Sequence, residues 1–207
     1  LTTTASSGST VNFNRNGDQQ ILLTPNYQNL TISGSGNKSL AGLTTVNGNI
    51  SVLGTSVLNL NSNILNALGN TTISNGATLE VDDNAQLLVA NTKVVTNNGT
   101  LKVVGSSGNP AIVSRNGATG GYSISQNSSG AIFEANNYQF NYLNGGIAIS
   151  NGTINSTNNF SNGSFSNGTG SQYLLLTGAD LTGLPNVTNV TFNPGPLANV
   201  TRTSGTG

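Results

Sequence analysis

The chain of 207 residues carries six basic and six acidic side chains and has no Cys, His, Met or Trp. A net charge of zero excludes the basic footprint of a nucleic-acid binder and a polybasic membrane patch. The absence of Cys and His excludes disulfides, thiol or imidazole nucleophiles and the usual zinc sites.

Polarity comes from uncharged side chains, because 35 residues are Asn and only 6% of the chain is charged. Typical soluble domains are roughly 25% charged. Disordered chains are usually charged and poor in β-branched residues, whereas Val, Ile, Leu and Thr recur throughout this one. No apolar run reaches the roughly 18 residues of a membrane-spanning helix. We therefore expect an ordered protein without a membrane span.

Short stretches of alternating apolar and polar residues, each followed by a turn signal, run along the chain. They lie at residues 30–32, 50–52, 58–60, 79–81, 101–103 and 147–149. This alternation predicts very short β-strands. The nearest approach to a helical stripe is at residues 61–70, which are short and polar, and we expect a buried turn there.

The predicted strands repeat with a period of roughly 20–25 residues, which is the range of solenoid repeats. Leu30 and Ile50 are one such period apart, and two longer series have similar steps: Leu58, Leu79, Leu101, Ile124 and Ile147 in the first, and Leu87, Ile112, Ile132, Ile154 and Leu174 in the second. Two series with one period mean that each repeat supplies more than one strand. The sequence predicts an all-β, right-handed parallel β-helix with coils of about 20–25 residues.

The alternative fold is an antiparallel β-sandwich, because strand signals at a spacing of about 8–12 residues suit it too. The very short strands and the 5% content of aromatic residues argue against a sandwich core. In the β-helix we expect an interior of stacked aliphatic side chains. Leu58, Leu79, Leu101 and Ile147 should share one inward ladder. Glu80 and Lys102 should point outward, one coil apart, and form an ion pair.

Three motifs in the first quarter of the chain resemble a known repeat. Residues 10–21 read TVNFNRNGDQQI, residues 27–40 read YQNLTISGSGNKSL and residues 46–52 read VNGNISV. They resemble β-helical repeats of large secreted, adhesin-like cell-surface proteins of Bacteroidetes. The resemblance implies a secreted or cell-surface location and a structural or adhesive role. It indicates that residues 1–207 are a single solenoid segment of a longer protein, with the clearest repeats in 1–108 and looser rungs in 109–207.

Catalytic chemistry has few candidate residues, since the acids are Asp18, Glu80, Asp82, Asp83, Glu134 and Asp180. A glycosidase needs two carboxylates facing each other across a groove, whereas Glu80 and Asp82 share a parity and should both point outward. Asp82, Asp83 and Asn84 offer oxygens for Ca²⁺ but lack the spacing of a calcium loop. The candidate bases of a polysaccharide lyase, Lys93, Lys102 and Arg115, have no acid cluster within a rung. The Gly-rich residues 33–38 precede no helix and do not predict a phosphate loop.

We therefore predict no catalytic, metal or cofactor-binding residues. The expected function is that of a non-enzymatic structural or adhesive segment of a secreted bacterial cell-surface protein. Its expected partners are glycans or neighbouring domains of the same polypeptide, and its oligomeric state stays open. The alternatives are a polysaccharide lyase or glycosidase on a β-helix scaffold, and a subunit of a surface layer or extracellular filament.

Overall fold

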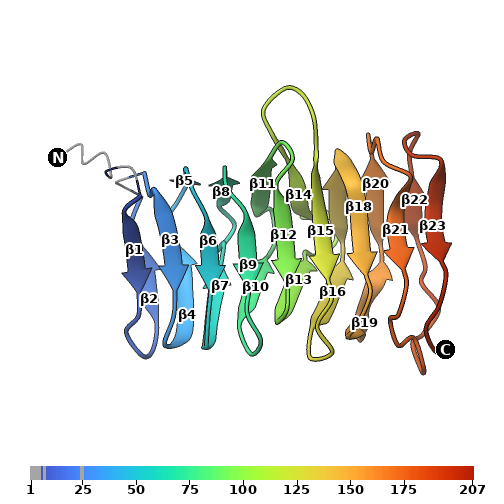
Figure 1. Ribbon diagram of the computed structural model, residues 1–207, viewed down its shortest axis with the longest axis horizontal. Coiled ribbons are helices and arrows are strands. Elements are labelled where there is room, and N and C mark those ends of the chain that lie inside the picture. The colour runs from blue at the N-terminus through green and yellow to red at the C-terminus, as the bar shows by residue number, and fades with distance from the viewer. Residues whose placement is uncertain (1–5, 7, 24–25) are drawn as a thin grey trace.

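The computed structural model describes residues 6, 8–23 and 26–207, which form 23 β-strands and no helix. The strands run across the long axis of the molecule, and the first and last strands, β1 and β23, lie at its opposite ends (Figure 1). All strand pairs between the named strands are parallel. Connections between parallel strands of one sheet are right-handed in about 98% of cases. The fold is the predicted right-handed parallel β-helix, and the parallel pairing excludes the antiparallel sandwich.

Three sheets, which we call A, B and C, form the sides of the solenoid, and the chain visits them in that order in each complete coil. Sheet A has nine strands: β1 (Thr10–Phe13), β3 (Asn29–Ile32), β6 (Ile50–Val52), β9 (Thr71–Ile73), β12 (Val94–Asn97), β15 (Tyr122–Gln126), β18 (Leu143–Ile149), β21 (Gln172–Leu176) and β23 (Ala198–Arg202).

Sheets B and C have seven strands each. Sheet B contains β2 (Gln19–Ile21), β4 (Ser35–Leu40), β7 (Thr55–Asn59), β10 (Thr78–Val81), β13 (Thr100–Val104), β16 (Ile132–Asn136) and β19 (Thr153–Ser161). Sheet C contains β5 (Thr44–Val46), β8 (Ile64–Ala67), β11 (Gln86–Ala90), β14 (Ala111–Asn116), β17 (Tyr138–Asn141), β20 (Gly163–Ser166) and β22 (Val190–Phe192). Strand β8 lies where the sequence had suggested a buried turn, and its Leu65 and Ala67 point inward.

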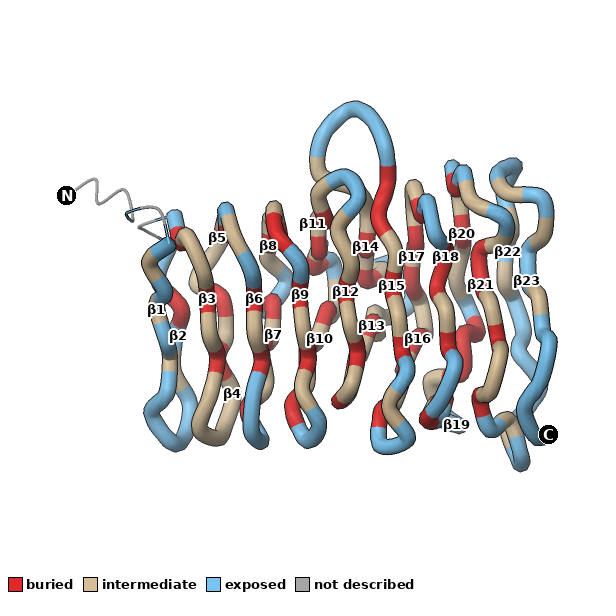
Figure 2. Tube along the Cα trace, viewed as in Figure 1, coloured by how far each residue is buried: buried red, intermediate tan, exposed pale blue. Residues whose placement is uncertain are grey.

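Alternate residues of the strands are buried, so that red and tan segments alternate along the coils in Figure 2. The central inward ladder of sheet B runs through Leu58, Leu79, Leu101 and Phe133. The prediction that Ile147 continues this ladder is wrong, because Ile147 lies in sheet A between Ile124 and Leu174. The second predicted series likewise crosses all three sheets.

The reason for both errors is that coil length varies along the solenoid. The coil that leads from Leu101 to its ladder neighbour Phe133 is about half as long again as the coil from Leu58 to Leu79. The additional residues leave the coil at its corners, as in the long loop between β14 and β15 (Figure 1). If equivalent positions are predicted with a constant number of residues per coil, the predicted positions therefore pass from one sheet to another.

The interior changes character along the axis. No aromatic residue occurs between Tyr27 and Tyr122, and this part is filled by aliphatic side chains as predicted. In the C-terminal coils aromatic rings replace them, contrary to the expectation of an aliphatic interior throughout. Phe140 and Phe165 stack with ring centroids 5.5 Å apart, and Phe165 and Phe192 with centroids 5.1 Å apart. The interior of these later coils is thus packed with larger side chains than that of the earlier ones.

Several buried polar groups lie inside the solenoid, and Lys38 shows how such a group can be fully hydrogen-bonded. Lys38 occupies the inward position beside Leu58, and its Nζ donates to the carbonyl oxygens of Arg15, Gly17 and Ser35. All three ammonium protons thus have acceptors, and burial lowers the pKa of Lys38. The Gly-rich residues before Lys38 consequently form part of a strand and its turn.

An asparagine ladder holds the corner that leads into sheet A. The side-chain oxygen of Asn29 accepts from the backbone N–H of Asn49, that of Asn49 from Asn70, and that of Asn70 from Val94. Each Asn thereby ties its own coil to the next one. No helix in the described part of the chain is long and apolar enough to cross a membrane.

Candidate functional site

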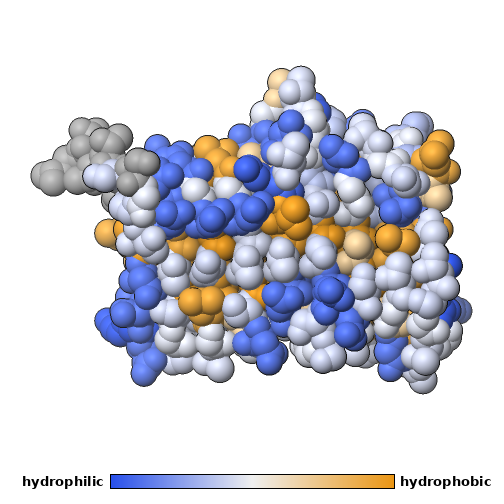
Figure 3. Space-filling view, in the orientation of Figure 1, coloured by the Kyte–Doolittle hydropathy of each residue, from blue (hydrophilic) through white to orange (hydrophobic). Residues whose placement is uncertain are grey.

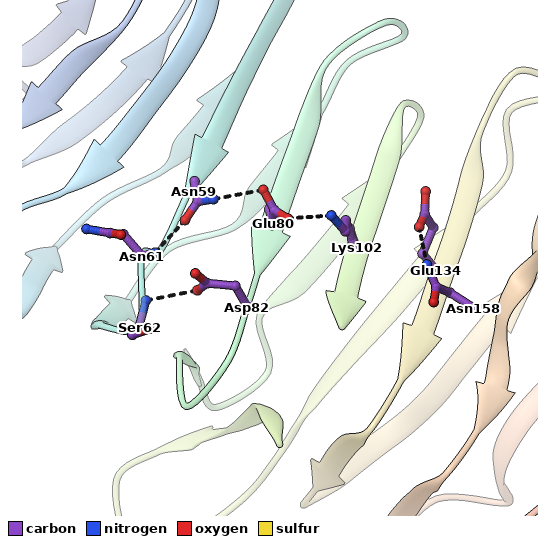
Figure 4. Close-up of polar contacts among 8 residues, drawn as sticks. All are labelled: Asn59, Asn61, Ser62, Glu80, Asp82, Lys102, Glu134 and Asn158. Atoms are coloured by element: carbon purple, nitrogen blue, oxygen red, sulfur yellow. Dashed lines mark hydrogen bonds and ion pairs between the residues drawn. The ribbon is translucent and has the colours of Figure 1, made fainter. Parts of the chain in front are cut away.

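The outer face of sheet B carries a row of charged and amide side chains (Figure 4). Glu80, Lys102 and Glu134 are neighbours on β10, β13 and β16. Lys102 Nζ lies 2.5 Å from Glu80 Oε1, so the predicted ion pair is confirmed. Asn59 donates to Glu80 at 2.8 Å and Asn158 donates to Glu134 at 2.8 Å. This row holds successive coils in register.

The other carboxylates cap turns. Asp18 Oδ1 accepts from the backbone N–H of Asn37, Asp82 Oδ1 accepts from that of Ser62, and Asp83 Oδ2 accepts from Ser106 Oγ. In the part of the chain that the structure describes, no three acidic side chains come together in a way that could hold a metal ion. The acids near residue 82 therefore link the turn after β10 to the coils before and after it.

Asp180 lies in the last turns of the chain and accepts hydrogen bonds from two threonines. Its Oδ1 accepts from the Thr182 backbone N–H at 2.9 Å and from Thr206 Oγ1 at 2.7 Å. These hydrogen bonds, those from Thr182 first, lower the pKa of Asp180 to about 2. The carboxylate is fixed in its charged form and joins the last two turns of the chain.

The candidate bases are apart from one another. Lys102 is engaged by Glu80. The guanidinium of Arg115 lies 3.8 Å from the centroid of the Tyr142 ring and donates to the Gly120 carbonyl. Lys93 directly precedes β12, at another corner of the solenoid. Lys102 is the candidate base that lies beside two carboxylates, those of Glu80 and Glu134 on the neighbouring strands, and its ammonium is paired with the first of them.

A polar groove of about 300 Å³ lies where sheet B turns into sheet C. Three corners in successive coils line its floor, each at an Asn with positive φ: Asn137, Asn162 and Asn189. The tight hairpin turn from Ser106 to Asn109 belongs to the preceding coil and forms one side of the groove. The remaining lining residues include Pro110, Gln139 and Ser164.

The groove was not predicted, although the sequence contains a signal for it. The pattern Asn-x-polar-Phe occurs at residues 137–140, 162–165 and 189–192. Asn tolerates the left-handed conformation that these corners adopt, and the Phe three positions later packs in or against the core. The steps between these motifs lie at and beyond the upper limit of the assumed period, so counting with that period does not connect them.

An apolar cavity of about 630 Å³ opens at the C-terminal coil. Sheets A and C continue to β23 and β22, whereas sheet B ends at β19. Ile154, Leu174 and Leu176 border this space and are each 7% exposed, while their neighbours one coil earlier, Phe133, Ile147 and Ile149, are 0% exposed. The interior of the last coil is thus incompletely filled.

Comparison with known proteins gives no relative, because no family model, no curated protein and no solved structure matches the chain.

Proposed function

We propose that this chain is a non-enzymatic structural and adhesive segment of a secreted or cell-surface bacterial protein. In this proposal the solenoid is a rod that holds neighbouring domains apart and presents an uncharged polar surface to glycans. The observation that carries the proposal is the continuous stacking of nine strands in sheet A. At about 4.8 Å per strand this gives a rod of roughly 38 Å.

The surface supports the same proposal. Hydrophilic and near-neutral residues cover most of the face in view in Figure 3, and hydrophobic residues form a narrow band along the long axis. With six basic and six acidic residues in the whole chain, contacts with partners depend on amide and hydroxyl groups. Such groups both donate and accept hydrogen bonds, which suits glycans.

The proposal is tested by measuring whether the chain binds polysaccharides without cleaving them. Purified chain should be retained on surfaces coated with bacterial or host polysaccharides, and antibodies raised against it should label intact cells of the source organism. The same polysaccharides should stay intact after long incubation, with and without Ca²⁺. New reducing ends or unsaturated products would favour an enzyme on this scaffold, and ordered polymers in electron micrographs would favour a filament subunit.

A further inference from the structure

We propose that the polar groove at the corner between sheets B and C is a binding site for a neutral saccharide. This inference deepens the adhesive part of the proposed function and rests on it. Six of the ten lining residues carry an amide or an aliphatic hydroxyl, and none of the ten is charged: Ser106, Gly108, Pro110, Asn137, Tyr138, Gln139, Asn162, Gly163, Ser164 and Asn189.

The chemistry of these groups favours a ligand rich in hydroxyls. Amides and hydroxyls can serve sugar hydroxyls as donors and as acceptors. A charged ligand would lose hydration in the groove without gaining a counter-charge. Asp83 lies beside the wall, where its carboxylate accepts from Ser106 Oγ at 2.8 Å, and the sign of its charge would repel an acidic sugar.

Two side chains on the floor are available to a ligand. Gln139 and Ser164 are neighbours in register on β17 and β20, and both point outward. Neither side chain hydrogen-bonds to any residue that the structure describes. Adjacent parallel strands lie about 4.8 Å apart, so these two side chains can reach hydroxyls of the same sugar unit.

The corner beside them is fixed before any ligand binds. Asn189 Nδ2 donates to Asn162 Oδ1 at 2.9 Å, and Asn162 Nδ2 donates to Asn136 Oδ1 at 3.0 Å. Asn137 Nδ2 donates to the same oxygen of Asn136 at 3.1 Å. A connected row of amides polarises its members and restrains their rotamers, which reduces the entropy lost on binding.

Gly163 makes room for the Tyr138 ring beneath the groove. A Cβ atom at Gly163 would point inward, as Phe165 does, and would lie 2.3 Å from the buried ring of Tyr138. The glycine thus allows Tyr138 to pack directly under the floor of the groove. The volume of about 300 Å³ lies at the lower end of the range for small-ligand sites and suits one or two sugar units.

The experiment compares matched variants of the full chain. Cellobiose, maltose and lactose would be titrated by saturation-transfer NMR and calorimetry, with a disaccharide containing glucuronic acid as the charged contrast. The double variant Gln139→Ala/Ser164→Ala removes the two free floor groups. Gln86→Ala is the control, because Gln86 occupies the same outward row of sheet C two coils earlier and does not line the groove.

At least one neutral disaccharide should bind, and the double variant should weaken that binding about tenfold or more, as expected for two lost hydrogen bonds. Gln86→Ala should bind like the parent chain, and unchanged melting curves would show that all variants fold. The inference is overturned if no neutral disaccharide binds, if the acidic one binds best, or if the double variant binds normally. A double variant that binds the disaccharide normally and is retained on polysaccharide surfaces would refute this site while leaving the adhesive function intact.

Discussion

At the scale of single residues, three charged side chains on the outer face of sheet B help to set the register of neighbouring strands. Lys102 lies between Glu80 and Glu134 on neighbouring strands, and the Lys102 and Glu80 side chains are 35% and 19% exposed. A pair that is partly exposed contributes at most about 1 kcal/mol. Its main effect is on register, because like charges directly opposite each other are unfavourable.

Charge reversal tests this row. Lys102→Glu would place three carboxylates on successive strands and should lower the free energy of unfolding by about 1 kcal/mol in urea titrations. Adding Glu80→Lys should restore only part of the loss, because residue 102 would still face Glu134. Lys93→Glu changes the net charge equally and is the control. A loss of similar size in that variant would show that net charge, and not the row, is responsible.

Asp180 gives the C-terminal turns a dependence on pH. Its folded pKa of about 2 is below the ordinary value of about 3.9, so the charged carboxylate stabilises the turns above pH ~4. This stabilisation should disappear as the pH falls from ~4 to ~2. The protection factor of the Thr182 amide, which is its exchange rate by NMR relative to the intrinsic rate at the same pH, should fall over that window. In the Asp180→Ala variant the protection factor should already be low at pH ~5 and should show no such step; a persisting step would assign the titration to another group.

At the scale of the strand, the inward or outward direction of a side chain decides its tolerance to substitution. Leu79 is fully buried between Leu58 and Leu101, whereas Thr78, its neighbour in β10, points outward. Leu79→Asp would bury an unpaired carboxylate and remove a side chain whose burial contributes roughly 1.5–3 kcal/mol. It should unfold the chain, while Thr78→Asp should be mild. Circular dichroism with thermal melts measures both, and equal tolerance would contradict the assignment of the inner face.

The same strands show what the sequence could predict. From Leu58 to Leu101 the coils are nearly equal in length, and both the inner ladder and the Glu80–Lys102 pair follow from simple counting. Beyond Leu101 corner loops of variable length break the count. Lys38 and Gln126 could not be placed inside by residue type, since their burial depends on carbonyl groups from other coils. The polar groove depends on three corners that only the fold brings together.

At the scale of the whole molecule, each coil contacts mainly its two neighbours, so stability is approximately a sum of coil and interface contributions. The last coil is the weakest by this measure. Sheet B provides no strand there among the described residues, the apolar cavity leaves inner side chains without partners, and Leu197 and Val200 are 97% and 47% exposed.

Hydrogen exchange should show that the last coil is less stable than the coils in the middle of the solenoid. Backbone amides of β10 and β13, in fully packed coils, should exchange most slowly, and those of β22 and β23 should exchange fastest among the strands. Peptide-resolved mass spectrometry can follow all strands in one experiment. Uniform protection from β10 to β23 would mean that the solenoid opens as one cooperative unit and that the cavity has no energetic consequence.

The strands cross the long axis (Figure 1), so the hydrogen bonds between coils point along that axis. A pulling force between the two ends of the rod therefore acts along these bonds and opens them one coil after another, as in a zipper, without the collective resistance of sheared strands. A coil such as that from Leu58 to Leu79 would release roughly 70 Å of extended chain. The rod thus keeps a fixed length at rest and lengthens stepwise under tension, so that each opened coil absorbs part of the pulling work.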